Sequence, residues 1–349
     1  MNQPIESPEE GARRRPTIAD VAERAGVSPT LVSFAVNGRP GVSAGTRERI
    51  LAAAKELRWS PSASARALTQ SRTRVIGLVL SRAAEQLEVD SFFVRFLSGV
   101  ERTLAPADYA MLLQLVPANG AAALGAYERL AAGGRVDGFL LTDPKLDDPR
   151  FKLLAEAGMP VVIAGRPAGD APFPWLETEH DRGITVGVEH LVELGHARIG
   201  FLGGPPAYAF VQRRLARWRQ GLAAAGLDAA RVTLAEADLG AAAAEMLARE
   251  PTAVVCTSDT LAIALITAAR ERGLSVPDDL SIIGFDDSLL ATLSSPALTS
   301  VRVDYVEFGA AASAALLAEI DGVGIRPYKP SPPTLEVRAS TAAPKPLRI

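Results

Sequence analysis

Short apolar runs alternate with longer stretches of helical length from residue 75 onward, and this alternation restricts the folds open to the chain. Continuous apolar runs of five to seven residues are typical of strands buried on both faces of a parallel sheet. Their alternation with helices predicts an α/β fold, and the length of the region predicts two such subdomains. The predicted strands cover residues 75–80, 109–115, 136–142, 160–164, 198–203, 253–257 and 280–285, and the helical stretches include residues 92–104, 183–194, 211–225 and 259–272.

Charge is distributed unevenly along the 349 residues. Residues 11–74 hold 12 Arg or Lys against 4 Asp or Glu, a net of +8, whereas residues 1–10 contribute −3 and residues 75–349 contribute −8. Fixed cations gain free energy when they release counterions from a phosphate backbone. Nucleic acid is therefore the first partner to test for the basic segment.

The basic segment contains apolar residues at helical spacing. Ile18 begins a pattern at i, i+3, i+4 and i+7, and Thr17 is placed to cap this helix. Gly26 ends it, and Ser28 can cap a second helix over residues 29–36. Two helices separated by so tight a turn predict a helix-turn-helix.

A third helix is expected after Ser43, with Ile50, Ala54 and Leu57 as its buried stripe. Three short helices around one small core form a unit that can lay its second helix in the major groove of DNA. The alternative is a three-helix packing module whose basic face is only solvated.

The composition gives no support for metal, redox or membrane chemistry. Cys256 is the single cysteine, and three histidines, His180, His190 and His196, show no ligand spacing with it. No apolar run is long enough to span a membrane, and the N-terminus lacks an apolar stretch of the secretory type. We therefore expect a cytoplasmic protein without a metal or cofactor, in which the histidines are structural or exposed.

Polar residues follow several of the predicted strands. Ser81, Asp143, Asp259 and Asp286 each come after a strand, and Arg214 lies near the start of the helix that follows residues 198–203. Open parallel sheets bind ligands beyond the carboxyl ends of their strands, so these side chains are candidates for a binding crevice. Carboxylates accept several hydrogen bonds and arginine donates in a fixed fork, which suits a ligand rich in hydroxyl or amide groups.

Each candidate also has a structural alternative. Asp286 or the adjacent Asp287 could cap the following turn, and Arg214 lies in a cluster of arginines that could form one solvated helix face. An aromatic side chain at the crevice could stack on a sugar ring or a base, but the first expectation for the large aromatics is the core. Those expected in the core are Phe92, Phe93, Trp175 and Trp218.

The head resembles a known family. The segment TIADVAERAGVSPTLVSFAVNGRPGVSAGTRERILAAAKELRWSPSASARAL, residues 17–68, is similar to the DNA-binding head of the lac repressor (LacI/GalR) family of bacterial transcription regulators. This resemblance implies that Pro29, Thr30 and Phe34 occupy the base-reading positions of the recognition helix. The residues that it places for phosphate contacts or for positioning are Thr17, Ser28, Ser33, Asn37 and Thr46.

Phe34 departs from the family pattern, which often has a polar or basic side chain there. Phenylalanine cannot make the bidentate contact to guanine that arginine makes, but it can touch a thymine methyl group. The operator is therefore expected to differ at that base pair. The alternative is that Phe34 packs inward against the third helix.

Residues 61–72 are expected to form a hinge helix and linker. The stretch is too short to be a stable helix alone, because nucleation outweighs so few hydrogen bonds. By the family resemblance it becomes helical on DNA, with Arg66 and Leu68 as contacts and Leu68 as a wedge between base steps in the minor groove. Without the resemblance, Leu68 is simply an apolar linker residue.

The rest of the chain resembles the effector domain of the same family, which shares its fold with periplasmic sugar-binding proteins. The motifs VDGFLLT, LGHARIGFLGGP, TSDTLAIALITAARERGLSVPDDLSIIGFDDS and ALTSVRVD carry this resemblance. It implies that Arg214, Asp259 and Asp286 bind the effector. Glu179 and His180 stand where the family usually has Asp and Asn.

The predicted organisation follows from both parts. A helix-turn-helix head precedes the hinge and a two-subdomain body of the periplasmic-binding-protein type. The predicted bounds are 1–15 for an N-terminal tail, 16–60 for the head, 61–72 for the hinge, 75–340 for the body and 341–349 for a C-terminal tail, with the first subdomain at about 75–175 and 304–325 and the second at about 176–303 and 326–340.

The function expected from the sequence is a ligand-responsive repressor that binds a pseudo-palindromic DNA operator as a homodimer. A small polar metabolite, with carbohydrate as the first class to test, would act as inducer or as corepressor. The alternative hypothesis, an enzyme, is not favoured, because the sequence contains neither a phosphate-binding glycine motif nor a nucleophile elbow. A solute-binding protein, the second rival, would need a signal peptide and would lack the basic head.

Overall fold

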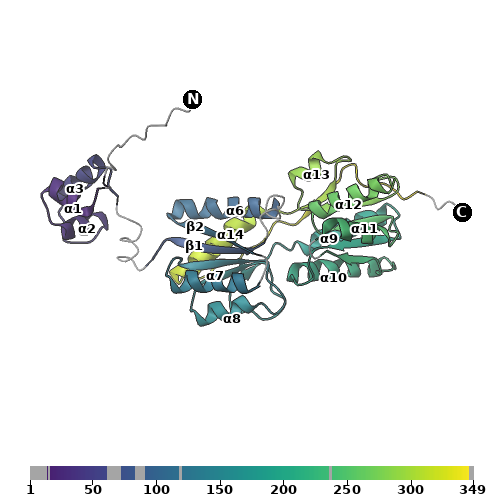
Figure 1. Ribbon diagram of the computed structural model, residues 1–349, viewed down its shortest axis with the longest axis horizontal. Helices are drawn as coiled ribbons and strands as arrows, with labels where there is room; N and C mark the ends of the chain where they lie inside the picture. Colours follow the sequence, from purple (N-terminus) through teal and green to yellow (C-terminus); the bar gives the residue numbers. More distant parts are fainter. Residues whose placement is uncertain are drawn as a thin grey trace, which may run out of the picture. The chain divides into compact units, whose positions relative to one another are not determined.

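The computed structural model describes residues 14, 16–60, 72–82, 91–117, 120–235 and 238–345. The chain separates into two compact units, residues 1–73 and 74–349, which are described in turn (Figure 1). The predicted hinge contacts at Arg66 and Leu68 lie outside the described residues, as do most of the predicted N-terminal tail and the last four residues of the chain.

Three helices form the head, and every pair of them is in contact. They are α1 (Ile18–Ala25), α2 (Pro29–Val36) and α3 (Ala44–Glu56). Their small core is centred on Val21, Val32 and Ile50, which are fully buried and surrounded by alanines. Leu57, expected in the buried stripe of α3, is its half-buried C-cap, and Ala53 is buried instead, because the helix ends at Glu56.

The head helices begin and end at the residues that the sequence predicts. The side chain of Thr17 accepts a hydrogen bond from the Asp20 amide, and the Asp20 carboxylate accepts one from the Thr17 amide at 2.7 Å. This reciprocal pair satisfies amide groups that a helix start leaves without partners. Gly26 ends α1 in the left-handed conformation, with φ 64°, and the Ser28 hydroxyl accepts from the Leu31 amide at the start of α2.

The first subdomain of the body is a parallel sheet with strand order β2-β1-β3-β4-β5. Its strands are β1 (Val75–Ser81), β2 (Ala110–Val116), β3 (Gly138–Thr142), β4 (Val161–Ala164) and β5 (Trp175–Leu176). The helical segments between them are α6 (Ser91–Leu104), η1 (Ala105–Ala107), α7 (Gly120–Ala132) and α8 (Pro149–Glu156). The predicted subdomain boundary, between residues 175 and 176, falls inside β5, which pairs with β4.

The second subdomain holds a sheet with strand order β11-β10-β9-β8-β6-β7, in which only the β10–β11 pairing is antiparallel. Its strands are β6 (Ile199–Gly203), β7 (Val232–Leu234), β8 (Ala253–Cys256), β9 (Ser281–Phe285), β10 (Thr299–Arg302) and β11 (Thr334–Glu336). Its helices are α9 (Asp181–Glu193), α10 (Ala209–Ala224), α11 (Leu239–Leu247), α12 (Asp259–Glu271) and α13 (Leu289–Leu293). Beyond the carboxyl ends of β6, β8 and β9 lie Arg214 on α10, Asp259 at the start of α12 and Asp286 in the loop after β9.

The chain returns to the first subdomain through α14 (Tyr305–Asp321) before it ends in the second sheet with β11. Figure 1 shows α14 beside α6, and the two helices are in close contact. Two glycines permit this approach: a Cβ atom on Gly99 would stand 2.0 Å from the Val306 carbonyl oxygen, and one on Gly309 would stand 2.1 Å from that of Phe96. The packing of α14 against α6 within the first subdomain therefore depends on close backbone-to-backbone contact.

Two further expectations about burial were wrong, both in the first subdomain of the body. Residues 109–115 were expected to be buried on both faces, but β2 lies at the sheet edge, and Leu115 is 46% exposed. Trp175 was expected in the core but is 42% exposed, because β5 is a two-residue edge strand, whereas Phe93 and Trp218 are buried. Apolar runs identify a strand but do not tell an edge position from a central one.

None of the described helices combines the length and the apolar character needed to cross a membrane. Within the same residues, no group of three or more His, Cys, Asp and Glu side chains is arranged to hold a metal ion.

Candidate functional site

The head presents its predicted DNA-contacting residues at helix starts and on α2. Ser28, Pro29 and Thr30 are exposed, and Phe34 lies one turn after Thr30 on the same face. Phe34 is half-buried, is absent from the hydrophobic core of the described head, and lies 5.7 Å from the Arg39 guanidinium carbon, measured to its ring centroid. The contacts therefore do not favour the inward-packed alternative for Phe34.

The predicted phosphate-contacting residues serve as caps or supports in the head. Thr17 and Ser28 cap α1 and α2, and the Asn37 amide group donates to the Ser33 carbonyl oxygen at 2.8 Å. The Thr46 hydroxyl accepts a hydrogen bond from Ser43, the N-cap of α3, at 2.9 Å. These side chains thus support the start of α1, both ends of α2 and the start of α3.

In the body, a cavity of about 600 Å³ lies at the carboxyl ends of the strands, between the two subdomains. All five residues predicted from the sequence line it: Ser81, Asp143, Arg214, Asp259 and Asp286. The same cavity is lined by residues that the sequence analysis did not select, including Phe92, His180, Tyr208, Phe210, Arg213 and Tyr305. The topology therefore collects one site from segments more than 200 residues apart.

Arg214 is buried on α10 at the centre of this cleft. Its Nη1 atom donates to the Thr257 carbonyl oxygen at 2.7 Å, and its Nε atom donates to Nδ1 of His180 at 3.2 Å. The guanidinium stacks on Phe285, with 3.6 Å from its carbon to the ring centroid. Arg214 is thus held rigidly, and the alternative that the arginine cluster is one solvated face is wrong for this member; Arg217 and Arg219 are exposed.

Asp286 follows β9 with a left-handed φ of 99° and accepts a hydrogen bond from the Tyr305 hydroxyl at 2.7 Å. Burial raises the pKa of its carboxyl to about 6, although Arg214 nearby works in the opposite direction. A half-buried carboxylate on a strained backbone, with Tyr305 as its hydrogen-bond donor among the described side chains, retains acceptor capacity for a ligand.

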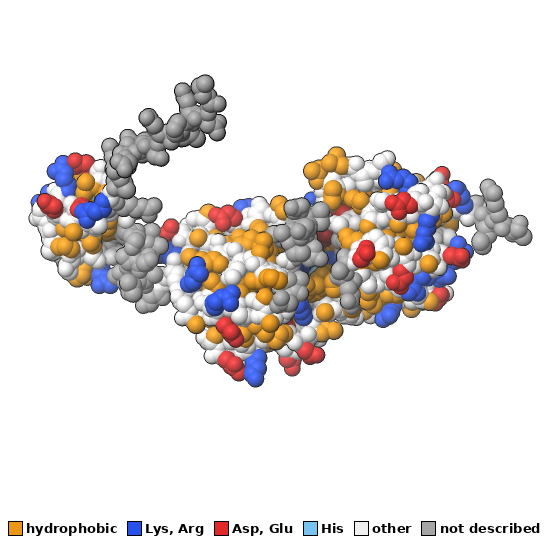
Figure 2. Space-filling view, in the orientation of Figure 1, with side chains coloured by type: hydrophobic (Ala, Val, Ile, Leu, Met, Phe, Trp, Pro, Cys, Tyr) orange, Lys and Arg blue, Asp and Glu red, His pale blue; other side chains and the backbone are white. Residues whose placement is uncertain are grey.

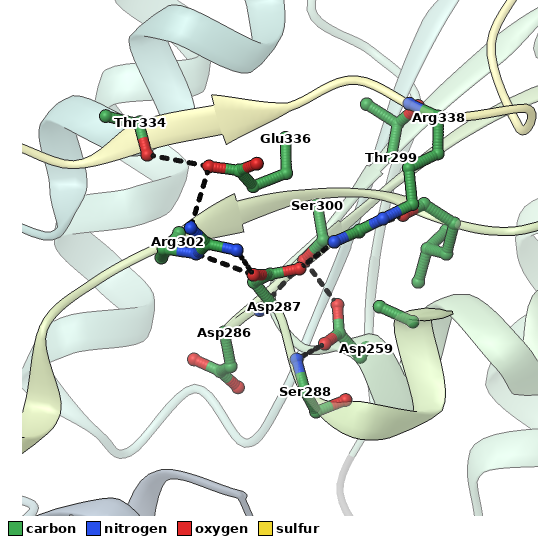
Figure 3. A network of polar contacts seen from close by, with 12 residues as sticks. Asp259, Asp286, Asp287, Ser288, Thr299, Ser300, Arg302, Thr334, Glu336 and Arg338 are labelled. Atoms are coloured by element: carbon green, nitrogen blue, oxygen red, sulfur yellow. Dashed lines mark hydrogen bonds and ion pairs between the residues drawn. The ribbon is translucent and has the colours of Figure 1, made fainter. Parts of the chain in front are cut away.

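Asp259 and Asp287 have their carboxylates engaged within the protein (Figure 3). The Asp259 carboxylate accepts from the Ser288 amide at 2.6 Å and from the Ser300 hydroxyl, and burial raises its pKa. Asp287 forms ion pairs with Arg302 and Arg338. Burial opposes ionisation of Asp287, but hydrogen bonds from both arginines outweigh it and lower its pKa.

Asp286 and Asp287 therefore diverge, as their adjacency in sequence predicts (Figure 3). Asp287 fastens β10 and the C-terminal segment, whereas Asp286 lines the cleft. Neither side chain caps α13, whose N-cap is Ser288, so the capping alternative is wrong.

The first subdomain contributes an ion pair and a bridge. Arg82 and Asp143 pair at 2.6 Å, and the Ser81 hydroxyl donates to the Pro117 carbonyl oxygen at 3.0 Å. Arg95, on α6, reaches across to the second subdomain, where its two terminal nitrogens donate to the carbonyl oxygens of Asp286 and Asp287 at 3.0 and 2.6 Å. The loop that carries Asp286 is thus tied directly to a helix of the opposite subdomain.

His180 and Arg213 were missed as site residues. His180 is the residue before α9. It was expected to be structural or exposed, and its departure from the family pattern was the available signal. Arg213 lies beside Arg214 in sequence, but helical geometry turns neighbouring residues through about 100°, and only contacts with other elements show that both line the cleft.

Comparison with known proteins gives consistent matches for both units. Residues 17–62 match the bacterial regulatory proteins of the lacI family, and residues 188–341 match the periplasmic binding protein-like domain. The chain is 34% identical to the HTH-type transcriptional regulator CelR of Thermobifida fusca over 91% of this chain and 95% of CelR. It is 33% identical to the HTH-type transcriptional regulator reg1 of Streptomyces lividans over 93% of this chain and 96% of reg1.

Two solved structures resemble the whole chain. The lac repressor dimer bound to operator and the anti-inducer ONPF matches with a TM-score of 0.82 and 28% identity, over 95% of this chain and 100% of that one. The complex of the transcriptional regulator CelR with cellobiose matches with a TM-score of 0.71 and 31% identity, over 93% of this chain and 100% of that one.

Proposed function

The chain belongs to the LacI family of bacterial regulatory proteins, and from this premise we propose that it is a ligand-controlled transcriptional repressor that binds a pseudo-palindromic operator as a homodimer. Its membership sets aside the enzyme and the solute-binding protein that the sequence left as rivals. The observation that carries the proposal is the cleft, which gathers polar side chains from both subdomains in a chain that also bears a helix-turn-helix head.

We assign operator reading to α2. Thr30 and Phe34 lie one turn apart on the same face of the helix, and Pro29 and Thr30 are exposed at its start. A helix of this kind reads base edges in the major groove, while Ser28 and Thr17 fix the backbone that meets phosphates. The apolar ring of Phe34 suits a thymine methyl group, so the operator half-site should carry an A·T pair at that position.

We assign effector binding to the cleft. Arg214 and Asp286 supply a fixed donor and a half-buried acceptor. The stacked rings of Tyr208 and Phe210 line the same cavity, with centroids 5.6 Å apart. Polar groups beside aromatic faces suit a small polyhydroxylated molecule, because sugar rings present both hydroxyls and apolar C–H faces. The cellobiose in the similar CelR structure supports carbohydrate as the ligand class.

Exposed apolar side chains support the homodimer. Leu289 and Leu293 on α13 are each 72% exposed, and hydrophobic side chains gather over this helix (Figure 2). In the first subdomain, Val94 on α6 is 66% exposed, and Leu115 is exposed on the neighbouring edge strand β2. Apolar patches in both subdomains are the kind of surface that a symmetric partner buries.

Control requires that the ligand favour one arrangement of the two subdomains. A ligand that contacts both Asp143 and Arg214 bridges them, and Arg95 links the Asp286 loop to α6 of the first subdomain. Such coupling typically changes operator affinity by a free energy of ~1–3 kcal/mol, roughly 5- to 150-fold. The mechanism is a shift between two closures of the cleft, one of which holds the head pair in the geometry of the operator.

The test begins with selection of bound sequences from a random DNA pool by the purified full-length protein. We expect enrichment of a pseudo-palindrome, whose affinity is then measured with and without a panel of sugars at fixed salt. Failure to enrich any sequence would contradict the regulator function. Enrichment without a response to any ligand in the panel would leave DNA binding intact but contradict the assigned ligand class.

A further inference from the structure

His180 occupies an unusual position between two arginines at the edge of the cleft. Its Nδ1 atom accepts from Arg214 Nε, and its Nε2 atom lies 3.3 Å from Nη2 of Arg213. The ring is buried, and burial together with the two guanidinium groups holds its pKa well below the usual value for histidine. The imidazole is therefore neutral at physiological pH, with one protonated and one unprotonated nitrogen.

The hydrogen bonds of this ring place two N–H donors, one of His180 and one of Arg213, opposite each other. If Nδ1 accepts from Arg214, the proton of the neutral ring is on Nε2, and this N–H then faces an N–H group of Arg213. Two donors cannot satisfy each other, and Nε of Arg213 is itself buried with no hydrogen-bond partner among the described residues. The site therefore needs an acceptor placed between Arg213 and His180.

The charged groups that line the cleft point to the nature of this acceptor. Among the described residues, five arginines and lysines line the cavity against three aspartates. Arg82 is paired with Asp143, and Arg166 lies 3.7 Å from Glu177. The cations that remain outside these pairs are Lys145, Arg213 and Arg214, and the remaining lining acids are Asp259 and Asp286. Glu177 and Asp181, which do not line the cavity, also attract Arg213 electrostatically.

The two remaining acids do not neutralise these cations fully. Both oxygens of Asp259 are engaged with Ser288 and Ser300, and burial raises the pKa values of both carboxyls. The cleft thus combines an acceptor end at Asp286 with a donor-rich end at Arg213 and His180. An acceptor-only group such as a carboxylate or phosphate satisfies donors of this kind more strongly than a neutral hydroxyl does.

We propose that the effector is a saccharide with an anionic group, a carboxylate or a phosphate, which Arg213 and His180 bind while the hydroxyls of the sugar face Asp286 and Arg214. This inference rests on the effector cleft assigned above and narrows its ligand class. It makes Arg213 and His180 the residues that discriminate acidic from neutral sugars.

Binding to the full-length protein is measured by calorimetry with matched pairs of probes. The pairs are D-glucose with D-glucuronate, D-galactose with D-galacturonate and cellobiose with cellobionate, and D-glucose 6-phosphate is added to separate phosphate from carboxylate. We expect at least one acidic probe to bind about tenfold or more tighter than its neutral partner, with a preference that weakens as salt is raised.

Two substitutions on the same helix give a matched comparison. Arg213→Gln removes the charge at the cleft and should reduce the acidic preference by about tenfold, with little effect on the neutral partner. Arg219→Gln removes an exposed charge from α10 outside the cavity and should leave the preference unchanged. His180→Gln should weaken acidic probes while the folded protein, checked by its thermal transition, persists.

Neutral probes that bind as tightly as acidic ones would overturn the proposal, as would equal effects of the two arginine substitutions. Absence of binding by every probe would overturn it as well. The function itself is judged separately, because sequence-specific DNA binding with release by a neutral sugar would refute only the acidic ligand class, whereas absence of specific DNA binding would refute the repressor.

Discussion

In the head, Ser28, Pro29 and Thr30 lie exposed at the start of α2, whereas in the body the residues expected to bind a ligand are buried or half-buried near the ends of strands. Thr30 meets solvent on α2, but Arg214 is enclosed by Thr257, His180 and Phe285. An exposed base-reading residue such as Thr30 can therefore be exchanged at little cost to the fold of the head. In the body, contact residues also hold the structure together, so binding and stability are linked at the same side chains.

The largest expected effect comes from Arg214→Ala. It should abolish the ligand response, because it removes the fixed donor at the centre of the cleft and leaves His180 without its hydrogen bond. Operator affinity in the absence of ligand should remain within about twofold, measured by fluorescence anisotropy. Arg219→Ala, on the exposed face of the same helix, is the control. A retained response would remove Arg214 from the site.

Asp287→Asn tests the structural side of the same loop. The substitution keeps the side-chain shape and tolerates the left-handed φ of 46°, but it removes the charge that pairs with Arg302 and Arg338. We expect a loss of about 2–4 kcal/mol in the free energy of unfolding of the body, less than for a fully buried pair because Arg302 is half exposed. Denaturant unfolding measures it, and a loss no larger than that of an exposed pair would contradict the account.

Gly99→Ala tests the close packing of α6 against α14. The added methyl group would meet the Val306 carbonyl oxygen, so the two helices must move apart. Overpacking of this kind typically costs about 1–3 kcal/mol. Gly125→Ala on α7, where an added Cβ meets only the flexible end of Arg129, is the matched control in thermal unfolding. Equal stability of the two variants would show that the helix contact adapts freely.

The pH dependence of ligand binding distinguishes the two adjacent aspartates. The pKa of Asp286 is raised to about 6, so its acceptor charge is lost as pH falls through that value, and ligand affinity should fall by up to about tenfold per pH unit below it. The same shift favours folding as pH falls from 6 toward 4, whereas the lowered pKa of Asp287 opposes folding at still lower pH. Asp286→Asn should flatten the affinity profile in calorimetry from pH 5 to 8, and an unchanged slope would exclude Asp286 as its origin.

The smallest effect is expected in the head. Thr17→Ala removes one half of the reciprocal cap of α1 and should cost about 1 kcal/mol of head stability without changing which operator sequence is preferred. Thr17→Ser retains the hydroxyl and should behave as the wild type. Selection of a different operator by the alanine variant would show that Thr17 reads bases as well as capping the helix.

Most of the helices and strands, and part of the set of residues that line the cleft, could be predicted from the sequence. Caps at Thr17 and Ser28 and the continuous apolar strands are local signals, and the structure has the elements that they predict. Five residues were selected by the rule that ligands bind beyond the carboxyl ends of strands, and all of them line one cavity: Ser81, Asp143, Arg214, Asp259 and Asp286. It could not tell that Asp259 is satisfied internally, because its partner Ser300 is 41 residues away.

Other features depend on contacts that no local pattern encodes. The exposure of Trp175 follows from the edge position of β5, which depends on the strand order of the whole sheet. The arrangement of His180 between two arginines needs the packing of α9 against α10. Sequence spacing therefore predicted which strand ends carry the site, whereas the division between binding and supporting residues required the fold.

The bonds from Arg95 have an evolutionary consequence. Its guanidinium donates hydrogen bonds to the main-chain carbonyl oxygens of residues 286 and 287. Any amino acid at these two positions would supply the same carbonyl oxygens. Homologous proteins can therefore change the side chain at position 286, and with it the ligand that is bound, while Arg95 still connects the two subdomains. Within this one loop, ligand specificity depends on a side chain and the connection between subdomains depends on the main chain, so the two properties can evolve independently.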